Sequence, residues 1–196
     1  HATSKIYQFD DLEKVASLGF RGEALASIGA VSRLRVASRA EMAKQAFEIV
    51  CEGEGSAPAP TAHPQGTTVE VRDLFYNTPA RRKFLRTPKT EFNHIETIVQ
   101  RLALSRFDVN FTLKHNDKTI FSTKISADIP QKERALASLL GESFIEQSVR
   151  IEFNAAGLAL TGWIGLPSFT RSQADMQYFY INGRYIRDKL LMHAVK

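Results

Sequence analysis

Two glycines separated by two residues stand directly before a stretch with helical spacing, in Gly19-Phe-Arg-Gly22-Glu-Ala-Leu25. Because glycine has no Cβ, backbone N–H groups in such a turn can point at a ligand, and a helix start adds about half a positive charge. The segment therefore predicts a cradle for phosphate. Taken alone it leaves a purely structural role open. Its candidate residues are Gly19, Phe20, Arg21, Gly22, Glu23, Ala24 and Leu25.

Two clusters of hydroxyl side chains are further candidates for contact with phosphate or nucleotide. Thr3 and Ser4 lie beside Lys5, so two hydroxyls and an ammonium group fall within three positions. Thr67 follows Gly66 at the start of an alternating segment, where glycine lets a ligand approach a sheet closely. Each cluster also has an ordinary explanation, as a polar terminus in the first case and as good strand formers in the second.

Two groups of basic residues could contact a polyanion. The first lies in residues 81–89, between a turn and a helix, and the second follows the Asn182-Gly183 turn. Phosphate contacts of this kind are independent of nucleotide sequence and weaken with salt. The alternative for the first group is a solvated face with Phe84 and Leu85 packed inward. The cations are Arg81, Arg82, Lys83, Arg86 and Lys89 in the first group, and Arg184, Arg187 and Lys189 in the second.

Composition excludes several classes of protein. The 196 residues carry a formal net charge of +5, which permits a polyanion partner without requiring one. Cys51 is the single cysteine, so no disulfide can form within the chain and a cytoplasmic setting fits. The histidines are scattered singly, so we expect no metal site. No apolar run approaches the roughly 20 residues that span a bilayer, so no membrane partner is expected.

Apolar spacing and turn residues predict an alternation of helices and strands. We expect helices at 10–18 and from residue 23, strands at 33–38 and 45–50, and a strand from 66 that ends in a turn at 76–79. The segment 52–66 is rich in glycine and proline and predicts an exposed loop without regular pairing.

The second half of the chain continues this alternation. The clearest helix covers 88–106, with Thr87 as its N-cap. A hairpin turns at Asn116-Asp117, a helix ends at Gly141, and strands run to Asn182-Gly183 before a helical end. The apolar stripe of the 88–106 helix is expected to consist of Phe92, Ile95, Val99 and Leu102.

The order of these segments resembles a known family. HATSK, GFRGEALASI, GTTVEVRDLFYNTPARRKFL, FNHIETIVQRLAL and YINGRYIRD together resemble the amino-terminal region of the MutL-like proteins, the mismatch-repair branch of the GHKL ATPases. The resemblance implies an α+β fold. Residues 1–129 would form the C-terminal part of an incomplete GHKL-type two-layer α/β sandwich that includes the ATP lid. Residues 130–196 would form part of a second, smaller, transducer-like α/β domain.

The resemblance also implies roles for the candidate residues. ATP and Mg²⁺ would be the cofactors of the complete domain, with Thr3, Ser4 and the amides of residues 21–25 near the phosphates. Thr67 would help to hold the adenine end through ordered water. Lys83, Arg86 and Lys189 match the family's DNA-contacting surface, which Arg184 and Arg187 could extend.

The family places its water-activating glutamate, its magnesium-binding asparagine and its adenine-reading motif upstream of the matched region. We therefore expect no catalytic residue in this chain, which reads as an excised piece that is inactive alone. The parent protein is expected to be a Mg-dependent ATPase that dimerises as a nucleotide-gated clamp and binds DNA without sequence preference. It would couple a mismatch-recognition protein to a repair endonuclease and a helicase, in the bacterial cytoplasm at the nucleoid. The alternatives are a non-enzymatic DNA-binding module and another GHKL ATPase, such as a topoisomerase subunit.

Overall fold

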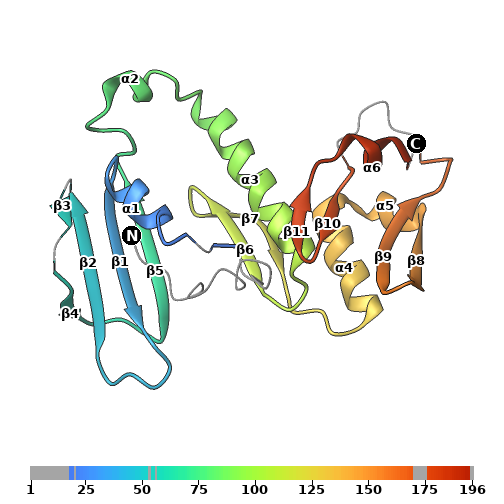
Figure 1. Ribbon diagram of the computed structural model, residues 1–196, viewed down its shortest axis with the longest axis horizontal. Coiled ribbons are helices and arrows are strands. Elements are labelled where there is room, and N and C mark those ends of the chain that lie inside the picture. Colours follow the sequence, from blue (N-terminus) through green and yellow to red (C-terminus); the bar gives the residue numbers. More distant parts are fainter. Residues whose placement is uncertain (1–17, 20, 53, 56, 170–175, 195–196) are drawn as a thin grey trace. The chain divides into compact units, whose positions relative to one another are not determined.

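The computed structural model describes residues 18–19, 21–52, 54–55, 57–169 and 176–194 (Figure 1). The chain divides into two compact units, His1–Arg86 and Thr87–Lys196. The break falls before the long helix α3 (Pro88–Ser105) because this helix contacts β6 (Phe111–His115) and α4 (Ile129–Leu140). The boundary expected between residues 129 and 130 separates the two domains that the family resemblance implies. The division into compact units does not test it, so it stays a prediction. Residues 10–17 of the helix expected at 10–18 lie outside the described residues.

The first unit contains a five-stranded sheet in which every described pairing is antiparallel. The strands follow the order β3-β2-β1-β5, and β4 also pairs with β2. Their bounds are β1 (Arg33–Arg39), β2 (Ala46–Glu52), β3 (Glu54–Gly55), β4 (Ala59–Thr61) and β5 (Gly66–Arg72). The three long strands confirm the elements predicted from alternation.

The segment 52–66 contains two short strands, so the expectation of a loop without regular pairing is wrong. Both strands pair with β2, and their registers place Cys51 opposite Gly55 and Phe47 opposite Pro60. The outer edge of β2 offers backbone hydrogen-bonding groups to a neighbouring extended segment. Proline is tolerated there because the missing N–H of an edge strand can face solvent. The segment therefore covers part of the β2 edge.

The two faces of this sheet differ in chemistry because side chains alternate along each strand. One face carries ion pairs, including Arg35 with Glu48 at 2.6 Å and Arg33 with Glu52 at 3.3 Å. The other face is apolar and follows Leu34, which is 3% exposed. Register places these apolar residues side by side: Leu34, Val36, Ile49, Cys51, Val69 and Val71.

Helix packing forms the core of the second unit. Ala103 and Leu104 of α3 contact Leu136 and Leu139 of α4, and Trp163 is among the aromatic residues that pack around this cluster. Around these helices the described residues of this unit form three antiparallel hairpins. The remaining elements are β7 (Lys118–Thr123), α5 (Glu142–Glu146), β8 (Ser148–Ala155), β9 (Leu158–Gly165), β10 (Phe179–Ile181), β11 (Arg184–Ile186) and α6 (Lys189–Ala194).

The ends of α3 and α4 confirm the helix signals in the sequence. The Thr87 hydroxyl accepts a hydrogen bond from the Thr90 amide at 3.3 Å, and Gly141 ends α4 with φ 97°. The apolar stripe predicted for α3 is wrong in part, since Ile95 is 50% exposed and the fully buried residues of this helix are Ala103 and Leu104. The last turn of the helix packs on α4, and earlier turns do not bury the whole stripe.

Both predicted hairpin turns have the backbone that their residues favour. Asn116 and Asp117 have φ values of 47° and 63°, and Asn182 and Gly183 have values of 48° and 76°. Two successive residues with positive φ match the twist of the flanking strands. The turn predicted at 76–79 begins earlier than expected, because β5 ends at Arg72 and the chain already turns at Asp73, with φ 50°.

Candidate nucleotide and nucleic-acid sites

The glycine-rich segment before α1 (Ala24–Gly29) has the backbone expected of a phosphate cradle. Gly22 has φ 68°, a conformation that residues with a side chain rarely adopt. Glu23 is the N-cap residue, and the first intrahelical hydrogen bond runs from the Ser27 amide to its carbonyl at 2.9 Å. The amides of Ala24 and Leu25 therefore precede the hydrogen-bonded turn and have no intrahelical acceptor. Phe20 lies outside the described residues.

A glycine holds α1 close to the apolar face of the sheet. A Cβ atom added at Gly29 would lie 3.3 Å from the Cβ of Cys51 and 3.3 Å from a methyl carbon of Leu34. Only glycine permits this approach without displacing a neighbour, since atoms in a packed interior have little room to move. The helix that follows the glycine-rich segment is thus held at its C-terminal end against β1 and β2.

Thr67 lies on the same face as α1. Its hydroxyl is 2.8 Å from that of Ser38, its partner in the register of β1 and β5. Ser38 is four residues along β1 from Leu34, which is roughly 13 Å at the usual rise of a strand. Sequence reasoning missed Ser38, because only the strand register shows that it pairs with Thr67. Thr3 and Ser4 lie outside the described residues.

The first basic group lies on a fully exposed segment. Every residue from Arg81 to Lys89 is exposed, and Phe84 is 82% exposed. The inward packing expected of Phe84 and Leu85 is therefore wrong, whereas a solvated face without a polyanion partner stays open. The turn before this segment is fastened to the end of α1, since the Asn77 side-chain amide donates to the Ala30 carbonyl at 2.9 Å. Lys83 ends the short helix α2 (Pro79–Arg82), and Arg86 follows in the exposed stretch.

The second basic group lies on and after the β10–β11 hairpin. Arg184 is half-buried at the start of β11, whereas Arg187 and Lys189 are exposed. This group belongs to the second compact unit and Lys83 and Arg86 belong to the first. A surface shared by the two groups therefore stays a prediction.

The described part of the chain contains no group of three or more His, Cys, Asp or Glu residues that could hold a metal ion. Among the same residues, no helix is long and apolar enough to cross a membrane.

The sheet with its glycine-rich segment defines the class of protein. The structure matches the ATPase domain of Aquifex aeolicus MutL complexed with ADP, with a TM-score of 0.69 and 31% identity, over 95% of this chain and 69% of that chain. A further solved structure, the N-terminal domain of a DNA repair protein, gives a TM-score of 0.69 at 28% identity, over 94% of this chain and 60% of that one. The fold is thus that of a GHKL-type ATPase domain.

Sequence comparison gives the family. The chain is 57% identical over its full length to the MutL proteins of Pseudomonas fluorescens and Azotobacter vinelandii. Residues 136–196 match a family model described as DNA mismatch repair protein, C-terminal domain. The chain belongs to the MutL family of DNA mismatch repair proteins. It spans 31% of the length of these relatives, and the match to MutL removes the topoisomerase alternative.

Proposed function

We propose that Gly19–Leu25 is the part of an ATP-binding site that closes over the nucleotide phosphates. The observation that carries this proposal is the left-handed Gly22 next to the N-cap residue of α1, a helix whose first amides have no intrahelical acceptor. Anions bind at such helix starts because the amides donate hydrogen bonds and the helix dipole is positive there. A related solved domain that holds ADP supports the same ligand.

Thr67 would contribute to the other end of the same site. It lies on the sheet face that carries α1, and its hydroxyl already pairs with that of Ser38. The separation along β1 suits an extended ligand that contacts both places. We propose that Thr67 contacts the adenine end through water, while Thr3 and Ser4 contribute near the phosphates.

The family resemblance assigns hydrolysis to groups upstream of the matched region, namely a water-activating glutamate and a magnesium-binding asparagine. Glu23 is the N-cap residue of α1 without a side-chain capping bond, a backbone position that does not make it a general base. We therefore assign no catalytic residue, and propose that Mg-dependent hydrolysis belongs to the complete domain.

The proposed role of the complete protein is a nucleotide-gated clamp in mismatch repair. ATP binding would favour a homodimer, and the dimer would pass the signal of a mismatch-recognition protein to a repair endonuclease and a helicase. We place this work in the bacterial cytoplasm, at the nucleoid. Family membership supports the proposal.

We also propose that both basic groups bind DNA through its phosphates. The exposed run of cations between Arg81 and Lys89 favours this function. Lys83→Glu with Arg86→Glu should weaken binding uniformly across DNA sequences and reduce the salt dependence. Lys118→Glu, on the exposed turn of the β6–β7 hairpin, is the matched control. Equal loss in control and test variants would remove the site from this segment.

A chimera tests the ATPase proposal. The matched stretch of the P. fluorescens MutL is replaced by this chain, and phosphate release from Mg-ATP is measured for the chimera and for this chain alone. We expect turnover from the chimera and background release from the chain. Robust turnover by the chain alone would contradict the assignment of hydrolysis to the complete domain. A folded chimera that does not retain a non-hydrolysable ATP analogue would contradict the ATP-binding role.

A further inference from the structure

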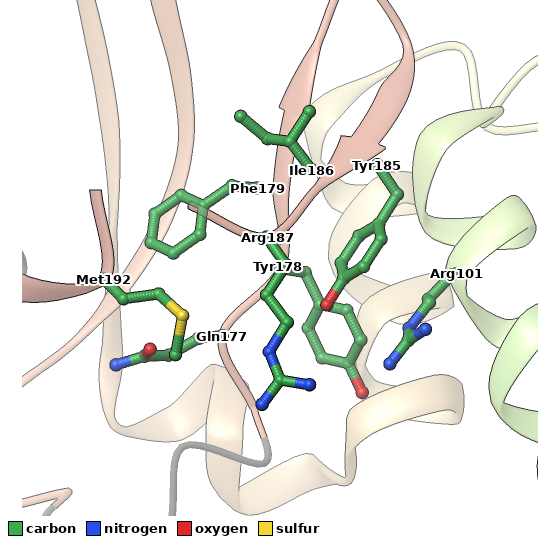
Figure 2. Close-up of a pocket in the computed structure, with 8 residues that line it drawn as sticks. All are labelled: Arg101, Gln177, Tyr178, Phe179, Tyr185, Ile186, Arg187 and Met192. Carbon is green, nitrogen blue, oxygen red and sulfur yellow. The ribbon is translucent and has the colours of Figure 1, made fainter. Parts of the chain in front are cut away.

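The second unit contains a small pocket between α3 and the β10–β11 hairpin, drawn in Figure 2. Its volume is about 180 Å³, and its polar lining includes Arg101, Gln177, Tyr178 and Arg187. In the view of Figure 2, both guanidinium groups and the Tyr178 ring extend to the same side. Pockets for drug-sized ligands have roughly 300–1,000 Å³. This pocket therefore suits a smaller group.

One arginine that lines the pocket has a buried nitrogen atom without a hydrogen-bond partner in the described part of the chain. The guanidinium carbon of Arg101 lies 4.4 Å from the centre of the Tyr185 ring. Its Nε atom is buried and has no hydrogen-bond partner among the described residues, and the same holds for Oε1 of Gln177. A buried donor left unpaired costs free energy that a ligand can recover. Rotation of the Gln177 amide by half a turn would present its NH₂ group to the same ligand.

The positive charge of the pocket is not neutralised by its own lining. Arg101 and Arg187 line it and no acidic residue does so among the described residues. The nearest acid in sequence, Asp188, is used elsewhere. Its carboxylate accepts hydrogen bonds from the amides of Leu190 and Leu191 at 2.9 and 3.0 Å at the start of α6. Two cations around one opening favour an anion between them.

We propose that this pocket binds a single phosphate group of the DNA backbone, with Arg101 and Arg187 as its ligands. The proposal rests on the DNA binding proposed above and names one defined contact within it. Phosphate fits because guanidinium groups present several N–H donors in a fixed fork. Arg187, which lines the pocket, is exposed, and so is Lys189 two residues later in the sequence. These two cations would guide a DNA strand towards the pocket.

The test compares charge with geometry at Arg101. Arg101→Lys retains the positive charge and loses the fork and its Nε–H, and Arg187→Gln removes the second cation. Lys118→Gln, on an exposed turn of the same unit, is the control. Binding of a labelled twelve-residue oligothymidylate is measured by fluorescence anisotropy at fixed salt, and thermal melting checks that each variant is folded.

Each pocket variant should bind the oligonucleotide about tenfold more weakly than the control, the size expected for loss of a hydrogen bond between charged groups. Inorganic phosphate at millimolar concentration should compete for the oligonucleotide, and acetate at the same concentration should not. Folded Arg101→Lys protein that binds like the control would overturn the proposal, and so would equal competition by acetate.

The oligonucleotide and phosphate arms also separate this proposal from DNA binding in general. If the oligonucleotide binds in a salt-dependent way and both pocket variants bind normally, the pocket proposal fails and DNA binding stands. If no oligonucleotide binds, the DNA-binding proposal fails. Phosphate binding that is detected by isothermal titration calorimetry and abolished by Arg101→Lys would then show an anion pocket with a different source of phosphate. That result would overturn the DNA assignment.

Discussion

Substitution of Gly22 is the sharpest structural test of the proposed ATP lid. Gly22 has φ 68°, in the left-handed region. A residue with a Cβ pays roughly 1–2 kcal/mol to adopt this conformation. Gly22→Ala should therefore reduce the population of the binding conformation, and so the affinity for nucleotide, by about 5- to 30-fold. Asparagine tolerates the left-handed region better than alanine, so Gly22→Asn should lose less.

The chain contains a matched control for this substitution. Gly162, in β9 and outside the proposed lid, is absent from the positive-φ residues of the described chain, and a Cβ atom added there meets nothing within 4 Å. Gly162→Ala should leave affinity nearly unchanged. The assay is equilibrium binding of a non-hydrolysable ATP analogue to the P. fluorescens chimera, with thermal melting as a check of folding. Equal affinities of the Gly22→Ala and Gly162→Ala proteins would refute the reasoning.

Three further predictions concern stability, each measured by urea unfolding of this chain. Leu136 is 5% exposed, so Leu136→Ala should lower the free energy of unfolding by about 2–5 kcal/mol. Ile98 is 56% exposed, so Ile98→Ala should change it by at most about 0.5 kcal/mol. Similar losses in the two variants would contradict the core assignment. Asp128→Ala removes the acceptor of the Gln131 amide and should cost about 0.5–2 kcal/mol, and an unchanged midpoint would argue against that cap. Burial raises the pKa of Tyr180 above its usual value near 10. The stability that Tyr180 contributes is therefore complete below about pH 10 and falls as the pH rises towards the folded-state pKa. Tyr180→Phe should flatten this alkaline decline in the free energy of unfolding, and an unchanged decline would contradict the prediction.

Local signals in the sequence were sufficient for most of the helices and turns. Thr87 before Pro88 predicted the start of α3, Gly141 the end of α4, and Asn116-Asp117 a hairpin, because each signal acts through the backbone of its own neighbours. The exposure of Ile95 could not be predicted in this way. Its burial depends on which turns of α3 other elements reach, and that is a property of tertiary packing.

Strand pairing was the main feature that the sequence did not show. The strands in 52–66 form because the edge of β2 lies beside them, and prolines in the sequence argue against a ladder until that edge is known. The same holds for the candidate sites. The glycine-rich turn before α1 was predicted from the sequence. The pair Ser38–Thr67 depends on strand register, and the pocket at Arg101 depends on helix α3 meeting a hairpin about 80 residues later.

Hydrogen–deuterium exchange of the lid segment tests the central proposal most directly. The P. fluorescens chimera is compared with and without a non-hydrolysable ATP analogue, and exchange is followed in peptides that cover residues 18–29 and in control peptides that cover the β6–β7 hairpin. Amides that donate to phosphate become protected, so exchange across residues 21–25 should slow on addition of the nucleotide while exchange in the hairpin stays the same. Binding of the analogue with unchanged exchange across residues 21–25 would contradict the assignment of this segment as an ATP lid.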